Sequence, residues 1–273
     1  MPTELIIEAG HTERNYWRDL FRYRELFYFL AWRDVLVRYK QTVIGILWAV
    51  LRPLLTMIVF TVVFSRIAKL PAEGVPYPVM VFAAMLPWQL FATSLSEGSS
   101  SLISNANLIS KVYFPRLIVP ASAVIVSFVD FAVSMVLLGA LMIFYKVWPG
   151  VSLLGLPLFT LLALLASAGA GTWLAALNVK YRDFRYVVPF IAQFGLYISP
   201  VGFSSSIVPD KWRLLYALNP MVGVIDGFRW SISPGQTPFP TQSLALSLLT
   251  VAFLLATGIW YFRKTERTFA DII

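Results

Sequence analysis

Six apolar segments follow one another along this chain, and each is long enough, or nearly long enough, to cross a lipid bilayer as a helix. A hydrocarbon core about 30 Å thick requires roughly 20 apolar residues per helix. With 58% hydrophobic and 13% charged residues, the sequence is too apolar for one soluble core. It predicts an all-α integral membrane protein, with a single membrane domain over 1–273 and a six-helix bundle over 43–262. The predicted spans are 43–65, 78–96, 117–144, 151–177, 186–203 and 243–262.

The distribution of lysine and arginine predicts the orientation of these spans. Fifteen of these residues precede the first span, follow the last, or lie in the 97–116 and 178–185 loops, whereas six lie in the opposite loops. Because basic residues are retained on the cytoplasmic side, we expect both termini in the cytoplasm. The basic residues lie beside apolar spans rather than on one soluble face, so the net charge of +8 predicts contact with anionic membrane lipids rather than nucleic-acid binding.

The N-terminal part has the pattern of an amphipathic helix over 14–31. Arg14, Arg18 and Arg22 are four residues apart, and aromatic and aliphatic side chains fill the other faces. Such a helix lies in the membrane interface or packs on a cytoplasmic partner. It leads into a basic and aromatic run at 33–48 in which the charges end at Lys40. This pattern indicates a chain that enters the bilayer from its positively charged side.

Two charged residues lie inside predicted spans. Asp130 is near the middle of 117–144, where a carboxylate is costly unless it is paired or functional. Arg52 is the charged residue at comparable depth that could pair with it, or it could bind carbonyl oxygens freed by a kink at Pro53. Proton coupling is the functional alternative for Asp130, but the spans contain no histidine or lysine for a relay.

The fourth predicted span carries small residues at intervals of four, which lets a second helix approach closely. The sequence does not indicate whether that helix belongs to the same chain. The small residues are Ala163, Ser167, Gly171 and Ala175.

The 204–242 connection is too long for a simple turn and contains two helix-like pieces, 209–217 and 220–232. Asn219 followed by Pro220 is a favourable helix start, and Asp226 and Arg229 are spaced to pair on one helix face. These short helices would dip into the outer leaflet and close a pore, or cap the bundle. The candidate outer-gate residues are Asn219, Asp226 and Arg229.

Two loops on the predicted cytoplasmic side are candidates for docking a soluble partner. The polar stretch 99–110 leads into a short helix that we expect to stop before Pro115, and 178–186 is compact and charged. Solvated loops would have a similar composition. The candidate docking residues are Leu108, Lys111, Tyr113, Lys180, Arg182 and Arg185.

The sequence lacks the common motifs of enzymes. It contains no Gly-Lys dipeptide, so it has no Walker A loop and no P-loop ATPase site of its own. One histidine, His11, and the absence of cysteine argue against zinc catalysis. We therefore expect a transport subunit with no cofactor or metal, whose energy comes from a partner or an ion gradient.

Four stretches together resemble the ABC-2 type permease family, and within it the subunits that export O-antigen, teichoic acid and related polysaccharides. They are 33–48, 51–54, 197–201 and 218–229, in the order of the family. The resemblance implies a homodimer in the bacterial inner membrane that passes a lipid-linked polysaccharide between its protomers. It also implies a cytosolic ABC ATPase that binds ATP and magnesium, contacted by the N-terminal helix and the 99–116 loop, with 204–232 as the outer gate.

Aromatic side chains in or beside three spans are candidates for lining a path for sugars. Aromatic rings stack on the weakly apolar faces of sugars, although anchoring at the membrane interface is their commoner use. The fifth predicted span is broken at 199–202, directly after one of these rings. The candidate channel residues are Trp48, Trp88, Phe91, Tyr197 and Phe203.

Two other classes of protein remain as alternatives. A proton-coupled secondary transporter would use Asp130 and need no ATPase. An integral membrane glycosyltransferase would need acidic residues grouped at one membrane face, and Glu97 and Asp183 are too few to form such a group.

Overall fold

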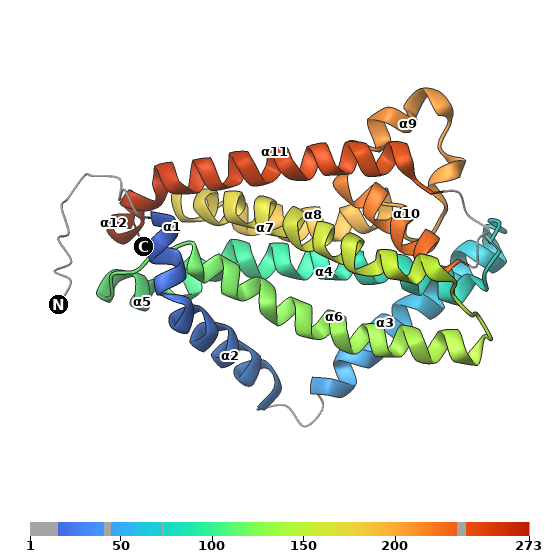
Figure 1. The fold of residues 1–273 in the computed structure, drawn as a ribbon, viewed down its shortest axis with the longest axis horizontal. Coiled ribbons are helices and arrows are strands. Elements are labelled where there is room, and N and C mark those ends of the chain that lie inside the picture. Colours follow the sequence, from blue (N-terminus) through green and yellow to red (C-terminus); the bar gives the residue numbers. More distant parts are fainter. Residues whose placement is uncertain (1–15, 41–44, 73, 234–238, 273) are drawn as a thin grey trace.

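The chain forms one elongated bundle of helices in the computed structural model, which describes residues 16–40, 45–72, 74–233 and 239–272 (Figure 1). Five segments are long and apolar enough to cross a membrane, and one apolar helix is shorter. The five are Val50–Ile67, Tyr77–Ser104, Ile118–Phe144, Val151–Lys180 and Thr241–Thr268, and the shorter helix is Phe184–Ile198. The described residues therefore confirm an all-α membrane protein.

The helices that build the bundle run along its long axis (Figure 1). Helix α3 continues as a π-helix, η1 (Thr61–Ile67), and a 3₁₀ turn, η2 (Val151–Gly155), precedes α7. The long helices are α3 (Gly45–Phe60), α4 (Tyr77–Ser104), α6 (Ile118–Phe144), α7 (Leu156–Lys180), α8 (Phe184–Ile198) and α11 (Thr241–Thr265).

Shorter elements lie at the two ends of the bundle. The helices α1 (Tyr16–Arg22), α5 (Ala106–Lys111) and α12 (Phe269–Ile272) lie at one end, and α9 (Asp210–Tyr216) and α10 (Pro220–Ile232) lie toward the other (Figure 1). The remaining elements are α2 (Arg24–Lys40), η3 (Ser205–Ile207) and η4 (Glu266–Thr268).

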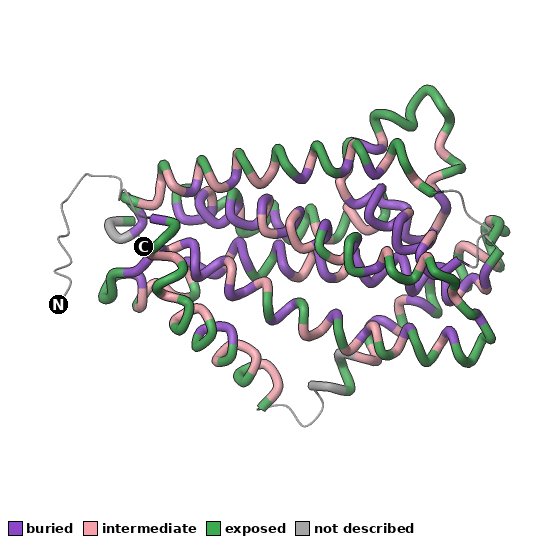
Figure 2. Tube along the Cα trace, viewed as in Figure 1, coloured by how far each residue is buried: buried purple, intermediate pink, exposed green. Residues whose placement is uncertain are grey.

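Helix α4 forms the centre of the bundle and packs against α6, α7 and α10. Its apolar half is buried on every face, as expected for a helix enclosed by other helices. Figure 2 shows the buried positions concentrated along α4, α7 and α10, with exposed positions on the outer helices. Six consecutive residues of α4 have no exposed surface: Val79, Met80, Val81, Phe82, Ala83 and Ala84.

The second predicted span is longer than the sequence indicated. Residues 99–104, expected in a loop, form the last turns of α4. Their serine hydroxyls donate to carbonyl oxygens one turn earlier, with Ser99 Oγ 2.9 Å from the oxygen of Ser96 and Ser101 Oγ 2.7 Å from that of Gly98. These internal bonds let a polar sequence stay helical and buried.

The fifth predicted span, 186–203, is wrong at its C-terminal end, because α8 stops at Ile198. Ser199 is extended, with ψ of 154°, as is usual for a residue before proline. The 15 residues of α8 are about 22 Å long at 1.5 Å per residue. This helix is therefore shorter than the hydrocarbon core of a bilayer.

The N-terminal helix also differs from the predicted 14–31. Two helices are present, α1 and α2, and α2 continues to Lys40. Residues 14 and 15 lie outside the described part. Helix α2 lies beside α6 (Figure 1), so Arg33 and Arg38, which the sequence placed at the water boundary, are on a helix that packs against the bundle.

The small residues of α7 face helices of the same chain. Ala163, Ser167 and Ala175 are fully buried, and a Cβ on Gly171 would lie 3.8 Å from the carbonyl oxygen of Ser94 in α4. On another face, a Cβ on Gly258 of α11 would lie 2.3 Å from the carbonyl oxygen of Gly169. Close helix approach is thus confirmed on the predicted face of α7, and α7 has a second close contact, which was not predicted, at Gly169.

We predict that Gly258→Ala destabilises the protein by about 1–3 kcal/mol, because the new methyl group meets backbone that cannot move without separating α7 from α11. Gly139→Ala is the matched control, since a Cβ there meets nothing within 4 Å. Unfolding in mixed micelles measures both. Equal stability of the two variants would contradict the close contact.

Candidate functional site

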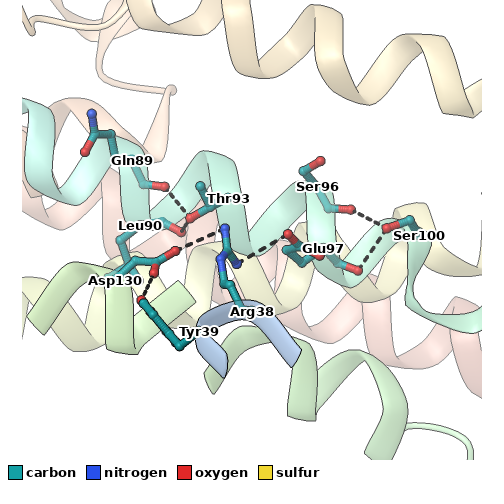
Figure 3. A network of polar contacts seen from close by, with 9 residues as sticks. All are labelled: Arg38, Tyr39, Gln89, Leu90, Thr93, Ser96, Glu97, Ser100 and Asp130. Carbon is teal, nitrogen blue, oxygen red and sulfur yellow. Dashed lines mark hydrogen bonds and ion pairs between the residues drawn. The ribbon is translucent and has the colours of Figure 1, made fainter. Parts of the chain in front are cut away.

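Helix α2 brings two side chains to the carboxylate in the middle of α6. Arg38 Nη2 lies 3.1 Å from Asp130 Oδ2, and the Tyr39 hydroxyl donates a hydrogen bond to Asp130 Oδ1. Arg38 Nη1 also lies 3.5 Å from Glu97 Oε1 of α4. Figure 3 shows Arg38 between the two carboxylates. We call Arg38, Tyr39, Glu97 and Asp130 the α2 latch.

The latch corrects the predicted partner of Asp130. The sequence indicated Arg52, whereas the structure pairs Asp130 with Arg38 and Tyr39. The reason is the length of α2, whose last turn reaches Asp130. The preferred interpretation of the sequence was a structural hydrogen bond or ion pair for this carboxylate, and the structure contains one of each.

Electrostatics keep Tyr39 in the form that the latch requires. Burial, followed by the hydrogen bond to Asp130, raises the pKa of the Tyr39 hydroxyl above its ordinary value. Tyr39 therefore stays protonated and donates. A second contact holds α2 nearer the end of the bundle, where Arg33 Nη2 donates to Asn105 Oδ1 at 2.8 Å.

A cavity of about 400 Å³ lies beside the latch, between α2, α3, α4 and α6, with Leu196 of α8 in its wall. We call it the latch cavity. It brings together four residues that the sequence singled out for two separate reasons, namely Trp48 and Trp88 as aromatic candidates and Arg52 and Asp130 as intramembrane charges. Its polar lining includes Arg38, Tyr39, Arg52, Thr56, Gln89, Thr93, Ser127, Asp130 and Ser134.

The five candidate channel aromatics occupy different environments. Trp48 is 57% exposed, whereas Trp88 is only 4% exposed and packs on Phe91 at 5.6 Å between ring centres. Tyr197 is 60% exposed on α8 and stacks on Phe60 at 6.2 Å. Trp48 and Trp88 line the latch cavity, while Phe91, Tyr197 and Phe203 lie outside its lining. Their role as a channel surface stays a prediction.

Helix α8 covers Trp88 closely. A Cβ on Gly195 would lie 2.3 Å from Cη2 of the Trp88 ring, so glycine is required at this contact. The absence of a side chain on Gly195 lets α8 complete the wall of the latch cavity.

At the other end of the bundle, the side chains of Arg229 and Tyr216 bind the end of α8 and the segment that follows it. Arg229 is 2% exposed, and its Nη1 and Nη2 donate to the carbonyl oxygens of Phe203 and Val201 at 2.8 and 3.1 Å. The Tyr216 hydroxyl donates to the oxygen of Ile198 at 2.8 Å. Carbonyl groups at and after the end of a helix have no helical donors. Arg229 and Tyr216 supply the missing hydrogen-bond donors.

Asn219 joins the same two segments. Its Oδ1 accepts a hydrogen bond from the backbone nitrogen of Met221 at 3.0 Å, which confirms the predicted N-cap of α10. Its Nδ2 donates to Ser199 Oγ at 2.9 Å. We call Ser199, Tyr216, Asn219 and Arg229, with the carbonyl groups that they bind, the gate clasp.

Helix α10 is inserted between α4, α7 and α11, which favours a helix that dips into the bundle over one that caps it. Asp226 accepts hydrogen bonds from Ser205 Oγ at 2.8 Å and Ser243 Oγ at 3.5 Å. The pairing of Asp226 with Arg229 stays a prediction. Asp226 and Arg229 both line a second cavity of about 490 Å³ beside α9 and α11.

The candidate docking residues gather at the end where α1, α5 and α12 lie (Figure 1). Lys111, Tyr113, Lys180, Arg182 and Arg185 are exposed there, and Leu108 is partly buried. An apolar cluster beneath them includes Ile109 of α5, Val179 of α7 and Phe269 of α12.

Glu266 fixes the base of this surface. Its Oε1 accepts from the backbone nitrogen of Arg116 at 2.9 Å and from the Tyr16 hydroxyl at 3.4 Å. Arg263 lies 4.5 Å from the centre of the Tyr16 ring. The N-terminal helix, the 105–117 segment and the C-terminal part thus form one platform, which sequence reasoning missed because its members are far apart in the chain.

The described residues contain no group of three or more histidine, cysteine, aspartate or glutamate side chains placed to hold a metal ion.

Sequence reasoning also missed the latch as a unit. Asp130 was the available signal, because a carboxylate inside a span requires a partner.

Comparison with known proteins identifies similar chains. The sequence pattern of the family described as ABC-2 type transporter matches residues 25–232. An O-antigen export system permease protein RfbA of Myxococcus xanthus is 30% identical over 94% of this chain and 98% of its own length. A protein of the same name from Klebsiella pneumoniae is 26% identical over 88% and 92%. The polysialic acid transport protein KpsM of Escherichia coli is 21% identical over 86% and 91%.

We predict that the ion pair between Arg38 and Asp130 contributes a measurable amount to the free energy of unfolding. In a double-mutant cycle of Arg38→Gln and Asp130→Asn, we expect a coupling of roughly 1–3 kcal/mol, because these groups are partly buried and share a network. The exposed pair Arg213 and Asp210, 2.8 Å apart, is the control and should couple by about 0.3–0.5 kcal/mol. Unfolding in mixed micelles gives both values, and equal couplings would rule out a structural latch.

Proposed function

Because this chain belongs to the ABC-2 type transporter family, we propose that it is the permease subunit of an ABC exporter that moves a lipid-linked polysaccharide across the bacterial inner membrane. One observation carries the proposal. The matched range, 25–232, contains the latch, the latch cavity, the docking residues and the gate clasp together. O-antigen is the favoured cargo, since the relative that is 30% identical exports it by name. Teichoic acid and capsule are the other candidates.

The energy source is a separate cytosolic ATPase that binds ATP and magnesium. The sequence contains no Gly-Lys dipeptide and therefore no phosphate loop of its own. The exposed basic residues beside α5 and at the end of α7 supply a surface for this partner. The excess of positive charge on these loops favours a cytoplasmic position for them and for both termini.

The transport path lies between two copies of the chain, in this proposal. Helix α8 exposes a row of aromatic side chains, including Phe190, Phe194 and Tyr197. Rings on a helix surface give a sliding polymer broad contacts without a fixed set of hydrogen bonds. The gate clasp, at the end opposite the docking surface, would control the outer opening of this path.

The structure gives no support to proton coupling through Asp130. Its carboxylate is occupied by Arg38 and Tyr39, which accounts for its presence in a span. The comparisons support an exporter driven by an ATPase rather than a secondary transporter.

The exporter proposal is tested by assembly and energy dependence. We expect the purified chain alone to lack ATPase activity and to co-purify with a co-expressed ATPase. Export of surface polysaccharide should stop when the Walker A lysine of that ATPase is replaced. Lys111→Glu and Arg182→Glu should lower co-purification several-fold, because they reverse charges on the docking surface. Lys211→Glu in α9 is the matched control and should assemble normally. ATP hydrolysis by the isolated chain would refute the proposal.

The aromatic path is tested separately with Tyr197→Ala. We expect a several-fold loss of surface polysaccharide per folded complex, with assembly with the ATPase and basal ATP hydrolysis unchanged, because in this proposal the ring contacts cargo and lies at the end of α8 away from the docking surface. Phe253→Ala, at an exposed ring on α11, is the control and should retain export. Export that falls only in proportion to the amount of folded protein would show that Tyr197 is an anchor.

A further inference from the structure

A narrow apolar crevice lies between α6, α7 and α11, with a volume of about 120 Å³. On the α7 side it is lined by Ala168 and Gly171, whose small side chains leave the space between the flanking helices unfilled. Thr172 also lines it, but its hydroxyl donates to the carbonyl oxygen of Ala168 at 2.8 Å and is therefore bonded within its own helix. Ala121 of α6 and Ile259 of α11 line the sides. This crevice fits an acyl chain rather than a polar ligand.

A groove with basic side chains adjoins the crevice at the C-terminal end of α11 (Figure 1). Its volume is about 530 Å³, and its lining includes Trp260, Arg263, Lys264 and Arg267. Ile259 lines both the groove and the crevice, so the two meet at this residue. Trp260 is exposed, and Lys264 Nζ lies 5.2 Å from the centre of its ring. An apolar surface and a basic surface thus lie next to each other on one helix.

The acid in this segment is bound elsewhere. Glu266 does not line the groove, and its Oε1 accepts hydrogen bonds from the backbone nitrogen of Arg116 and from the Tyr16 hydroxyl. Three basic residues and one acid give the segment 263–267 a net charge of +2. The groove is therefore positive, and an anion is the complementary ligand.

The three basic residues have different accessibility. Arg263 is partly buried and lies 4.5 Å from the centre of the Tyr16 ring on the platform. Lys264 and Arg267 are exposed. A ligand that approaches from the membrane side would therefore meet Lys264 and Arg267 first.

The order of these features along α11 matches the order of groups in a phospholipid. Leu255 and Ile259 line the crevice, and Lys264 and Arg267 follow one to three turns nearer the end of the span. Tryptophan, lysine and arginine are typical of the membrane interface, and basic pockets beside spans bind anionic lipid headgroups. A free phosphate would use the groove and leave the crevice empty, whereas a phospholipid uses both.

We propose that the groove and the crevice together form a specific binding site for an anionic phospholipid of the phosphatidylglycerol class. Its phosphate binds Lys264 and Arg267, and one acyl chain occupies the crevice between α6, α7 and α11. The bound lipid fixes the end of α11 and with it Arg263, which packs on Tyr16 of the platform. The site goes beyond the proposed transport function, because lipid binding requires neither cargo nor ATPase.

The test titrates the full-length chain in detergent with dioleoylphosphatidylglycerol or dioleoylphosphatidylcholine and counts bound lipids by native mass spectrometry. The double variant Lys264→Gln with Arg267→Gln should weaken phosphatidylglycerol binding by about 10- to 30-fold, because each basic residue near an anionic headgroup contributes roughly fivefold. Phosphatidylcholine binding should not change. The matched control, Lys180→Gln with Arg182→Gln, removes two exposed charges from the same end of the bundle and should bind phosphatidylglycerol like the natural chain.

A second arm tests the crevice without changing any charge. Ala121→Leu fills the crevice and should weaken binding of both lipids by about 4- to 15-fold, as expected when one or two methylene groups lose their buried place. Val124→Phe, one turn farther along the crevice wall, is an independent filling variant. Thermal unfolding in lipid-free detergent checks that each variant is folded. Unchanged lipid affinity in a folded filling variant would exclude the crevice from the site.

Three other results would overturn the proposal. The first is equal affinity of the natural chain for the two lipids. The second is full competition by glycerophosphoglycerol, the headgroup without acyl chains, which would show a site for free anions. The third is a Lys264→Gln and Arg267→Gln variant that keeps its phosphatidylglycerol affinity but no longer co-purifies with the ATPase, which would assign the groove to that protein. Failure of the exporter proposal would leave the lipid result intact, because the titration contains the chain and lipid alone.

Discussion

The pairing of Asp130 with Arg38 and Tyr39 is the interaction on which the arrangement of the N-terminal half depends. A carboxylate in the middle of an apolar helix has to be paired, and its partners come from a helix that is not itself a span. The ion pair therefore holds α2 against α6, and its branch to Glu97 holds it against α4. Arg38 and Tyr39 of α2 form one side of the latch cavity. Trp48 and Arg52 line that space together with residues of α4 and α6.

The same requirement, that buried polar groups find partners, shapes the opposite end. Ser199 and Pro200 end α8 early, and the carbonyl groups beyond the break have no helical donors. Arg229 and Tyr216 supply the missing donors, so the broken helix and α10 become one unit. Arg229, with almost no exposed surface, donates to the backbone carbonyl oxygens of Phe203 and Val201, and these bonds stabilise its buried charge. The early end of α8 leaves carbonyl groups without donors, and binding these groups stabilises the buried Arg229.

The sequence predicted what depends on neighbouring residues and missed what depends on distant ones. Apolar length predicted most of the spans, the Asn219–Pro220 pair predicted the N-cap of α10, and small residues predicted close packing of α7. The length of α4 was missed because serine counts as polar in a sequence, although its hydroxyl can bond within its own helix. The partner of Asp130 was missed because Arg52 was the charged residue at comparable depth in a predicted span, whereas Arg38 reaches Asp130 only through the path of α2. The gathering of Trp48, Trp88 and Arg52 around one cavity likewise depends on packing.

Helix α2 also connects two parts of the molecule that the proposed function uses, the platform and the latch. It begins beside α1, where Tyr16 bonds to Glu266 on the docking platform, and it ends at the latch beside Arg52. A continuous helix moves largely as a unit, and shifts of packed helices are an established means of switching. In an exporter driven by a separate ATPase, a shift of the platform would reach Arg38 through α2 and change its contact with Asp130. Loosening that contact would release α2 from α6 and widen the latch cavity, so one helix would relate ATPase docking to the interior of the bundle without a change in its other helices.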